Sequence, residues 1–272
     1  MSDAVPDEVA AYYASYPEEG RLAKGSSRLE FERTKEILER VLPEAPARVV
    51  DIGGAAGAYS AWLAERGYEV HLVDAAPRLV EEARRRSAKL RKPIASLSVA
   101  DARRLPRENA SADAVLVMGP LYHLTEAADR ETALQEAARI LVPGGLIVAA
   151  GISRYASALD GLARNLTADP RFVAIRDRDL VDGQHRNPTE RIDYFTTAYF
   201  HRPEDLRAEL ESAGFDGVHV LGVEGPGWML SDFDARWKDP TLRGEILEVA
   251  RRLEAEPSIV AASAHLLGVG RK

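Results

Sequence analysis

The segment VVDIGGAAGAYSAWL, residues 49–63, places an acid and a glycine cluster between an apolar run and a helix-like stretch. Asp51 is followed by Gly53, Gly54 and Gly57, which gives the pattern D-x-G-G-x-x-G. A glycine-rich turn from strand to helix lets the backbone approach a cofactor closely. These three glycines do not have the spacing of the G-x-G-x-x-G dinucleotide fingerprint. A carboxylate at this turn would repel a pyrophosphate and favour a positively charged group.

S-Adenosylmethionine meets this requirement, because it carries an ammonium and a sulfonium group and no phosphate. Asp74 ends the next apolar run. We expect it to accept hydrogen bonds from both ribose hydroxyls, as an acid about 20 residues further on does in dinucleotide folds. Asp101 follows the third run and is expected to accept from the adenine amino group, with the backbone of Ala102 against the ring.

Apolar runs alternate with helix-like stretches between residues 47 and 152, which predicts a parallel, doubly wound sheet with helices on both faces. Ligands of such sheets bind at the carboxyl ends of the strands. The expected strands are 47–53, 68–74, 96–101, 112–119 and 145–152, and the expected helices are 28–42, 58–67, 77–91 and 126–142.

Several motifs resemble those of class I S-adenosylmethionine-dependent methyltransferases: DIGGAAG, LVDAAP, VADARRLP, ADAVLVMGPLYHLTEAADR and ARILVPGGLIVAA. The GPLYHL segment resembles a bacterial subgroup that acts on small molecules. The resemblance implies a seven-stranded, mostly parallel sheet in the order 3-2-1-4-5-7-6 with the last strand antiparallel. DGVHVLGVEG and HLLGVGRK would be its sixth and seventh strands. Ala55 stands where the family usually has its second glycine.

The chain is expected to form a single α/β methyltransferase domain. Within it, we expect a helical N-terminal lid at 1–46, a cofactor-binding core at 47–152, a cap insertion at 153–198, and the remainder of the sheet at 199–272.

The expected cofactor contacts cluster at the strand ends, and S-adenosylhomocysteine would be the product. Arg28 would pair with the methionine carboxylate, although a surface position is an open alternative for it, as packing is for Tyr59. The residues are Asp51, Gly53, Gly54, Ala55, Gly57, Tyr59, Asp74, Ala75, Asp101, Ala102, Met118 and Arg28.

His123 and Tyr122 follow the fourth strand, near the expected position of the transferable methyl group. Histidine can take a proton at neutral pH, so His123 is the candidate general base, with Tyr122 beside it. The alternative is that both residues only wall the cofactor pocket. A base is needed only where the acceptor is a hydroxyl or an ammonium group, whereas a carboxylate acceptor needs none.

The candidate substrate-binding residues are Tyr13 in the lid and Arg154, His185 and His201 in or beside the cap. The last three could hold an anionic substrate, and each could equally be structural. No His or carboxylate cluster has metal-ligand spacing in the sequence, so we expect no metal.

The amino-acid composition limits the classes of partner and the chemistry that we expect for this chain. The net charge of −7 argues against nucleic acid, the absence of cysteine excludes thiolate chemistry, and no apolar run is long enough to span a membrane. We expect a cytoplasmic monomer or homodimer that methylates an O, N or C atom of a small molecule. A peptide or protein methyltransferase and, less favoured, a nicotinamide-dependent oxidoreductase are the alternatives.

Overall fold

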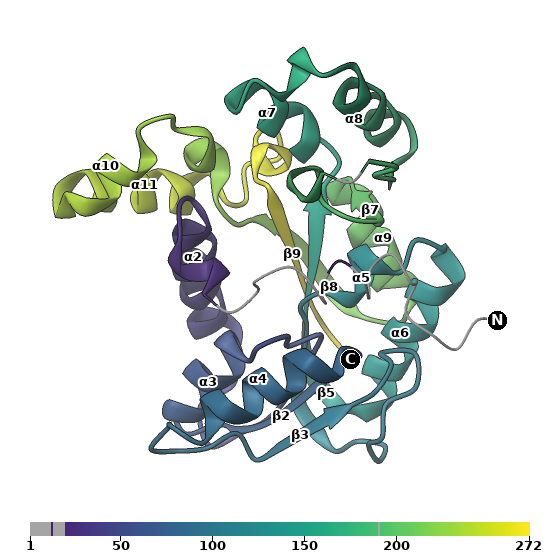
Figure 1. Ribbon diagram of the computed structural model, residues 1–272. Helices are drawn as coiled ribbons and strands as arrows, with labels where there is room; N and C mark the ends of the chain where they lie inside the picture. Colours follow the sequence, from purple (N-terminus) through teal and green to yellow (C-terminus); the bar gives the residue numbers. More distant parts are fainter. Residues whose placement is uncertain (1–11, 13–19, 190) are drawn as a thin grey trace.

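The computed structural model describes residues 12, 20–189 and 191–272 (Figure 1). Its central sheet runs β3-β2-β1-β4-β5-β9-β8; β9 is antiparallel to both of its neighbours, and the first five strands are parallel. This confirms the expected order of seven strands with the last antiparallel. The strands are β1 Arg48–Ile52, β2 Glu69–Asp74, β3 Ser96–Val99, β4 Ala112–Val117, β5 Leu141–Ser153, β8 Asp216–Gly222 and β9 His265–Arg271.

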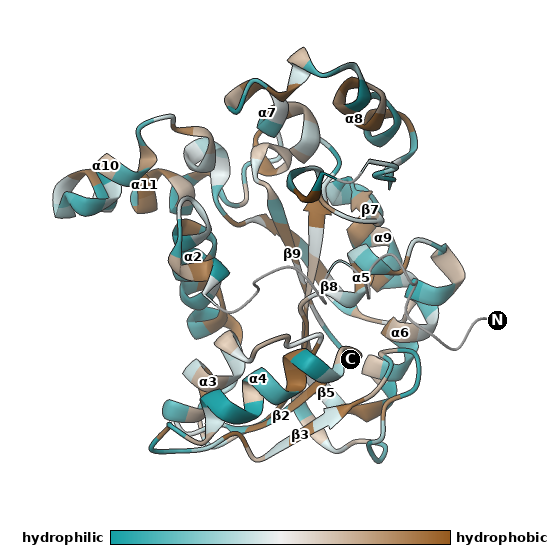
Figure 2. Ribbon diagram, viewed as in Figure 1, coloured by the Kyte–Doolittle hydropathy of each residue, from teal (hydrophilic) through white to brown (hydrophobic). Residues whose placement is uncertain are grey.

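Helices cover both faces of the sheet, because strands buried on both sides need apolar partners on each. On one face lie α2 Ser27–Val41, α3 Ala58–Glu65 and α4 Pro77–Ser87, which pack Ile37, Leu63 and Val80 onto the sheet. On the other lie α6 Ala127–Ile140 and α9 Pro203–Ser212, through Leu134 and Leu206. Figure 2 shows hydrophobic colour along the strands and hydrophilic colour over much of α4.

A short additional hairpin joins the sheet where β5 runs past its neighbours. β7 Ala198–His201 pairs in parallel with the last two residues of β5, and β6 Gln184–His185 pairs antiparallel with β7. The segment between β5 and β7 contains α7 Ala156–Ala163, η2 Leu166–Ala168, α8 Pro170–Asp182 and η3 Ile192–Tyr194. In Figure 1, α7 and α8 lie beyond the carboxyl end of β5.

Most of the remaining elements connect β8 to β9, and two short helices lie elsewhere in the chain. They are η4 Gly225–Met229, α10 Phe233–Lys238, α11 Pro240–Leu253 and η5 Val260–Ala262; η1 Arg21–Ala23 precedes α2, and α5 Pro120–His123 follows β4. In the part of the chain that is described, no helix combines the length and apolar character needed to cross a membrane.

Candidate active site

A cavity of about 1110 Å³ opens at the carboxyl ends of the strands. Residues from the glycine turn, from the ends of β2, β3 and β4, from α2 and from the segment between β5 and β7 line it. The structure therefore brings most of the expected site residues to one place. Those that line the cavity are Arg28, Gly53, Gly54, Ala55, Tyr59, Asp74, Ala75, Asp101, Ala102, Met118, Tyr122, His123 and His185.

The turn after β1 has no room for side chains at its first two glycines. A Cβ atom on Gly53, whose φ is +74°, would lie 2.5 Å from Pro120 Cδ, and one on Gly54 would lie 2.7 Å from Asp51 Oδ2. Ala55 itself adopts the left-handed conformation at φ +47°. Its backbone N–H donates to Asp74 Oδ2 at 2.8 Å, which ties the turn to the end of β2.

Asp51 lies directly behind this turn and does not line the cavity. Its side chain is fully buried, and Ser60 Oγ donates to its Oδ2 at 2.6 Å. The other oxygen, Oδ1, has no hydrogen-bond partner among the described residues. Burial and, secondarily, the nearby charge of Asp74 raise the pKa of Asp51 to about 6, against the opposing hydrogen bond from Ser60. A positive charge above the turn would stabilise the ionised form of Asp51.

Asp74 and Asp101 present carboxylates to the cavity from adjacent strand ends. Asp74 Oδ1 accepts the backbone N–H of Ala76 at 2.8 Å. Asp101 forms a bidentate pair with Arg103, at 2.6 and 3.0 Å. Burial acts to raise the pKa of Asp101, but the hydrogen bonds and charge of Arg103 hold it below its usual range. Asp101 is therefore ionised and can still accept a hydrogen bond through its remaining lone pairs.

His123 ends the short helix α5 and faces the cavity beside two aromatic rings. Its ring centroid lies 4.8 Å from that of Tyr122 and 6.0 Å from that of Phe195. Burial lowers the pKa of His123 to about 4, although a hydrogen bond with the backbone of Thr197 opposes this. The imidazole is thus neutral at pH 7 and can accept a hydrogen bond, but it is a weak base.

Two of the residues that the sequence suggested for substrate binding, Arg154 and His201, do not line the cavity. Arg154 is buried and donates to the carbonyl of Phe200 at 2.7 Å. His201 is buried, with Nε2 3.2 Å from Glu209. Arg154 thus connects the end of β5 to β7, and His201 connects β7 to α9. Gly57 also lies off the cavity, and Tyr13 lies outside the described residues.

His185 lines the cavity but is held within the protein. Its Nδ1 lies 2.8 Å from Asp179 Oδ2 and its Nε2 lies 2.8 Å from the carbonyl oxygen of Tyr194. Its ring stacks on Phe200, with centroids 4.7 Å apart. Since both ring nitrogens face acceptors, His185 cross-links β6, α8 and η3.

Sequence analysis missed a cluster of charged residues at the far side of the cavity. Glu30 of α2, Glu224 after β8 and His265 at the start of β9 have potential ligand atoms within 4.8 Å of one another. Arg21 donates to both oxygens of Glu30, at 2.7 and 2.9 Å. Spacing along the chain could not reveal this cluster, because its members come from three separate elements.

Comparison with known proteins identifies relatives of the chain. Residues 49–145 match the family model described as a methyltransferase domain. An uncharacterized methyltransferase of Mycobacterium tuberculosis is 32% identical over 173 residues, which cover 62% of each chain. The chain thus spans less than two thirds of that relative's length. Trans-aconitate 2-methyltransferase of Methylobacterium radiotolerans is 28% identical over 67% of this chain and 74% of its own.

Solved structures share the fold. A SAM-dependent methyltransferase from Mesorhizobium loti has a TM-score of 0.59 at 20% identity, covering 90% of this chain and all of that one. A structure from Thermotoga maritima described as a possible histamine N-methyltransferase has a TM-score of 0.58 at 19% identity, covering 98% and 99%.

Proposed function

Because this chain belongs to the class I S-adenosylmethionine-dependent methyltransferases, we propose that it transfers a methyl group from S-adenosylmethionine to a small molecule. One observation carries the proposal. The glycine turn after β1, Asp74 at the end of β2 and Asp101 after β3 line the same cavity.

The residues present fit this cofactor. Gly53 and Gly54 form a side-chain-free turn. Behind it, Asp51 Oδ1 has no hydrogen-bond partner in the described part of the chain, and a cationic ligand would stabilise its charge. A phosphate at the same place would meet the charge of Asp51, which disfavours the nicotinamide-dependent alternative. Asp74 would accept from the ribose, and Asp101 with the backbone of Ala102 would contact the adenine.

The expected role of Arg28 competes with contacts inside the protein. Arg28 lines the cavity, pairs with Asp234 and lies over the rings of Phe233 and Trp237 at 5.6 and 5.7 Å. To hold a methionine carboxylate it would have to share its guanidinium with Asp234, which is largely exposed.

When bound, the cofactor supplies an electrophilic methyl group on a positively charged sulfur. The protein's main contribution is to orient the acceptor in line with it, which is worth up to about 7–11 kcal/mol in well-oriented reactions. His123 and Tyr122 are the proposed orienting groups. Because His123 is a weak base, its main role is to accept a hydrogen bond. It would take a proton only from an acceptor that arrives protonated, such as a hydroxyl group, and not from a carboxylate.

The acceptor is proposed to be a small molecule, because the segment between β5 and β7 contributes several walls of the cavity. Trans-aconitate 2-methyltransferase and malonyl-[acyl-carrier protein] O-methyltransferases are among the relatives. Their names support a carboxylate acceptor, either free or carried by a protein. A peptide or protein acceptor is therefore the second candidate.

Calorimetry with four ligands tests the proposal: S-adenosylmethionine, S-adenosylhomocysteine, NAD⁺ and NADH. We expect the first two to bind and the nucleotides not to bind. Binding of a dinucleotide in their place would overturn the proposal. Incubation with methyl-labelled cofactor and a metabolite extract, followed by mass analysis, would then identify the acceptor.

A further inference from the structure

His265 lines the cavity and lies at the start of β9, the strand next to β5. It pairs with Ile152 of β5 in the antiparallel register, and both residues line the cavity. Val117, the last residue of β4, pairs with Ala149. His265 therefore lies level with a point on β5 that is past the end of β4.

Two buried carboxylates determine the protonation of this histidine. Glu224 Oε2 accepts the backbone N–H of His265 at 3.0 Å, and its Oε1 lies 2.5 Å from Nδ1, which must donate to it. Glu30 Oε2 lies 4.0 Å from the same nitrogen. Burial alone would lower the pKa of His265, but the charges of Glu30 and Glu224 raise it to about 9. Nε2 therefore also carries a proton at neutral pH.

The same contacts argue against a metal ion at this cluster. Arg21 donates to both oxygens of Glu30, and His265 donates to both oxygens of Glu224. Two carboxylates are thus balanced by one guanidinium and one imidazolium. A divalent cation would have to displace Arg21 and remove the Nδ1 proton of His265.

The Nε2–H group of His265 is left as a donor at the cavity wall. It makes no hydrogen bond to another described residue, and 28% of the side chain is exposed. Tyr59 also lies close to Glu30; its pKa is raised mainly by burial, and it stays neutral. The neighbouring wall includes Ile152, Trp228 and Ala264.

The carboxylates on the cap side of the cavity have cations of their own. Asp160 pairs with Arg164 at 2.9 Å, and Asp193 lies 3.7 Å from Arg191. Neither carboxylate is among the ion-pair partners of His265 in the described part of the chain, which are Glu224 and Glu30.

We propose that His265 is a specificity-determining residue that binds an oxyanion, a carboxylate or phosphate group, of the methyl acceptor through Nε2–H. This assignment rests on the proposed function, since it names the class of acceptor for that site. A charge-assisted hydrogen bond in a partly desolvated cavity favours an anion over its neutral isostere. An ammonium group at the same place would be repelled.

Phenylacetate and phenylacetamide, which match in shape and differ in charge, test the assignment. Their affinities are measured by ligand-observed NMR at pH 7.5, with and without S-adenosylhomocysteine. We expect the wild-type protein to prefer phenylacetate by at least about tenfold. His265→Gln should abolish the preference, and His219→Gln, a change of an exposed histidine on β8, should keep it.

A pH series provides a test that does not depend on the folding of a His265 variant. In the wild-type protein the preference should persist at pH 8 and decline as the pH passes about 9, where the imidazolium loses its proton. In Glu224→Gln, which removes one neighbouring charge, the decline should move to lower pH.

Equal affinity for the two probes in the wild-type protein would overturn the assignment, and so would a preference that survives His265→Gln. Failure of the proposed function has a different signature, because the wild-type protein would then not bind S-adenosylhomocysteine. The measurements without that ligand test the anion preference independently.

Discussion

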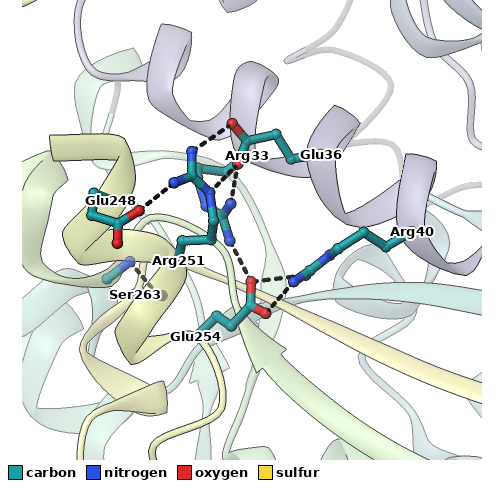
Figure 3. A network of polar contacts seen from close by, with 8 residues as sticks. Arg33, Glu36, Arg40, Glu248, Arg251, Glu254 and Ser263 are labelled. Carbon is teal, nitrogen blue, oxygen red and sulfur yellow. Dashed lines mark hydrogen bonds and ion pairs between the residues drawn. The ribbon is translucent and has the colours of Figure 1, made fainter. Parts of the chain in front are cut away.

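Arg33 of α2 forms an ion pair with Glu254, which follows α11, across 221 positions of the sequence. Arg33 is fully buried and also pairs with Glu36, while Arg40 donates to the same Glu254 at 2.6 and 2.9 Å (Figure 3). This network joins α2 to α11 and to the residue that follows it. Since α2 contributes Phe31 to the cavity, the network also fixes one wall of the site.

Replacement of Arg33 should be far more costly than replacement of Arg40. Arg33→Ala removes a buried cation and leaves Glu254 with one fewer partner, so we expect a loss of about 3–5 kcal/mol in the free energy of unfolding. Arg40 is 46% exposed, and Arg40→Ala should cost less than about 1 kcal/mol. Urea unfolding of both variants measures the difference. Similar losses would contradict the importance assigned to the burial of Arg33.

Asp51 should lower the stability of the ligand-free protein at neutral pH. Its folded pKa of about 6 lies above the unfolded value near 3.9, so the folded state binds more protons between these values. The stabilisation contributed by this group is present at low pH and is lost as the pH rises toward 6. The free energy of unfolding falls by at most about 3 kcal/mol as a result. Relative to Asp51→Asn, the wild-type protein should therefore lose stability between pH 4.5 and 7.5. Denaturant unfolding at both pH values would reveal the difference, and parallel pH dependences would contradict it.

Cofactor affinity should rise with pH, whereas stability falls, and both effects come from the ionisation of Asp51. A cationic ligand prefers ionised Asp51, so affinity for S-adenosylmethionine should rise as the pH increases through about 6. In Asp51→Asn we expect weaker binding without this rise. Calorimetry at pH 5 and 7.5 measures both effects. An affinity that is flat with pH in the wild-type protein would place the ligand's charge away from Asp51.

Gly54→Ala should damage the site because the added methyl group has no space. Its Cβ would lie 2.7 Å from Asp51 Oδ2 and 2.9 Å from Leu72 Cδ1. We expect a loss of about 1–3 kcal/mol in stability and weaker cofactor binding. Gly244→Ala is the control, because a Cβ at that position in α11 meets nothing within 4 Å. This change should stabilise by up to about 1 kcal/mol. Thermal melts and calorimetry distinguish the two variants.

His123→Ala should slow turnover while cofactor affinity stays near normal. The lowered pKa makes His123 a weak base, so we expect a loss in kcat below the roughly 100-fold typical of well-matched general bases. His123 should be neutral throughout pH 6–8, so its titration adds no inflection to kcat there. His219→Ala serves as the control. Unchanged turnover in His123→Ala would make this residue part of the wall only.

Residues close together in the chain could be assigned from the sequence. The turn from Gly53 to Gly57 and the acids Asp74 and Asp101 were predictable, because parallel strands present their carboxyl ends at one edge of the sheet. The order of the strands was implied by the resemblance of these motifs to the methyltransferase family, because the alternation of strands and helices does not fix it. Ala55, which stands where the family usually has its second glycine, adopts a left-handed conformation itself, and its backbone N–H donates to Asp74.

Only the tertiary structure decided the environment of the other polar residues. Arg154 and His201 carry the chemistry expected of an anion site, yet both are buried in contacts with the elements around β7. His265 had no local motif, and its charge comes from Glu30 and Glu224, which belong to other elements. Burial and through-space charge set the protonation of a side chain, and both depend on neighbours that are distant in the sequence.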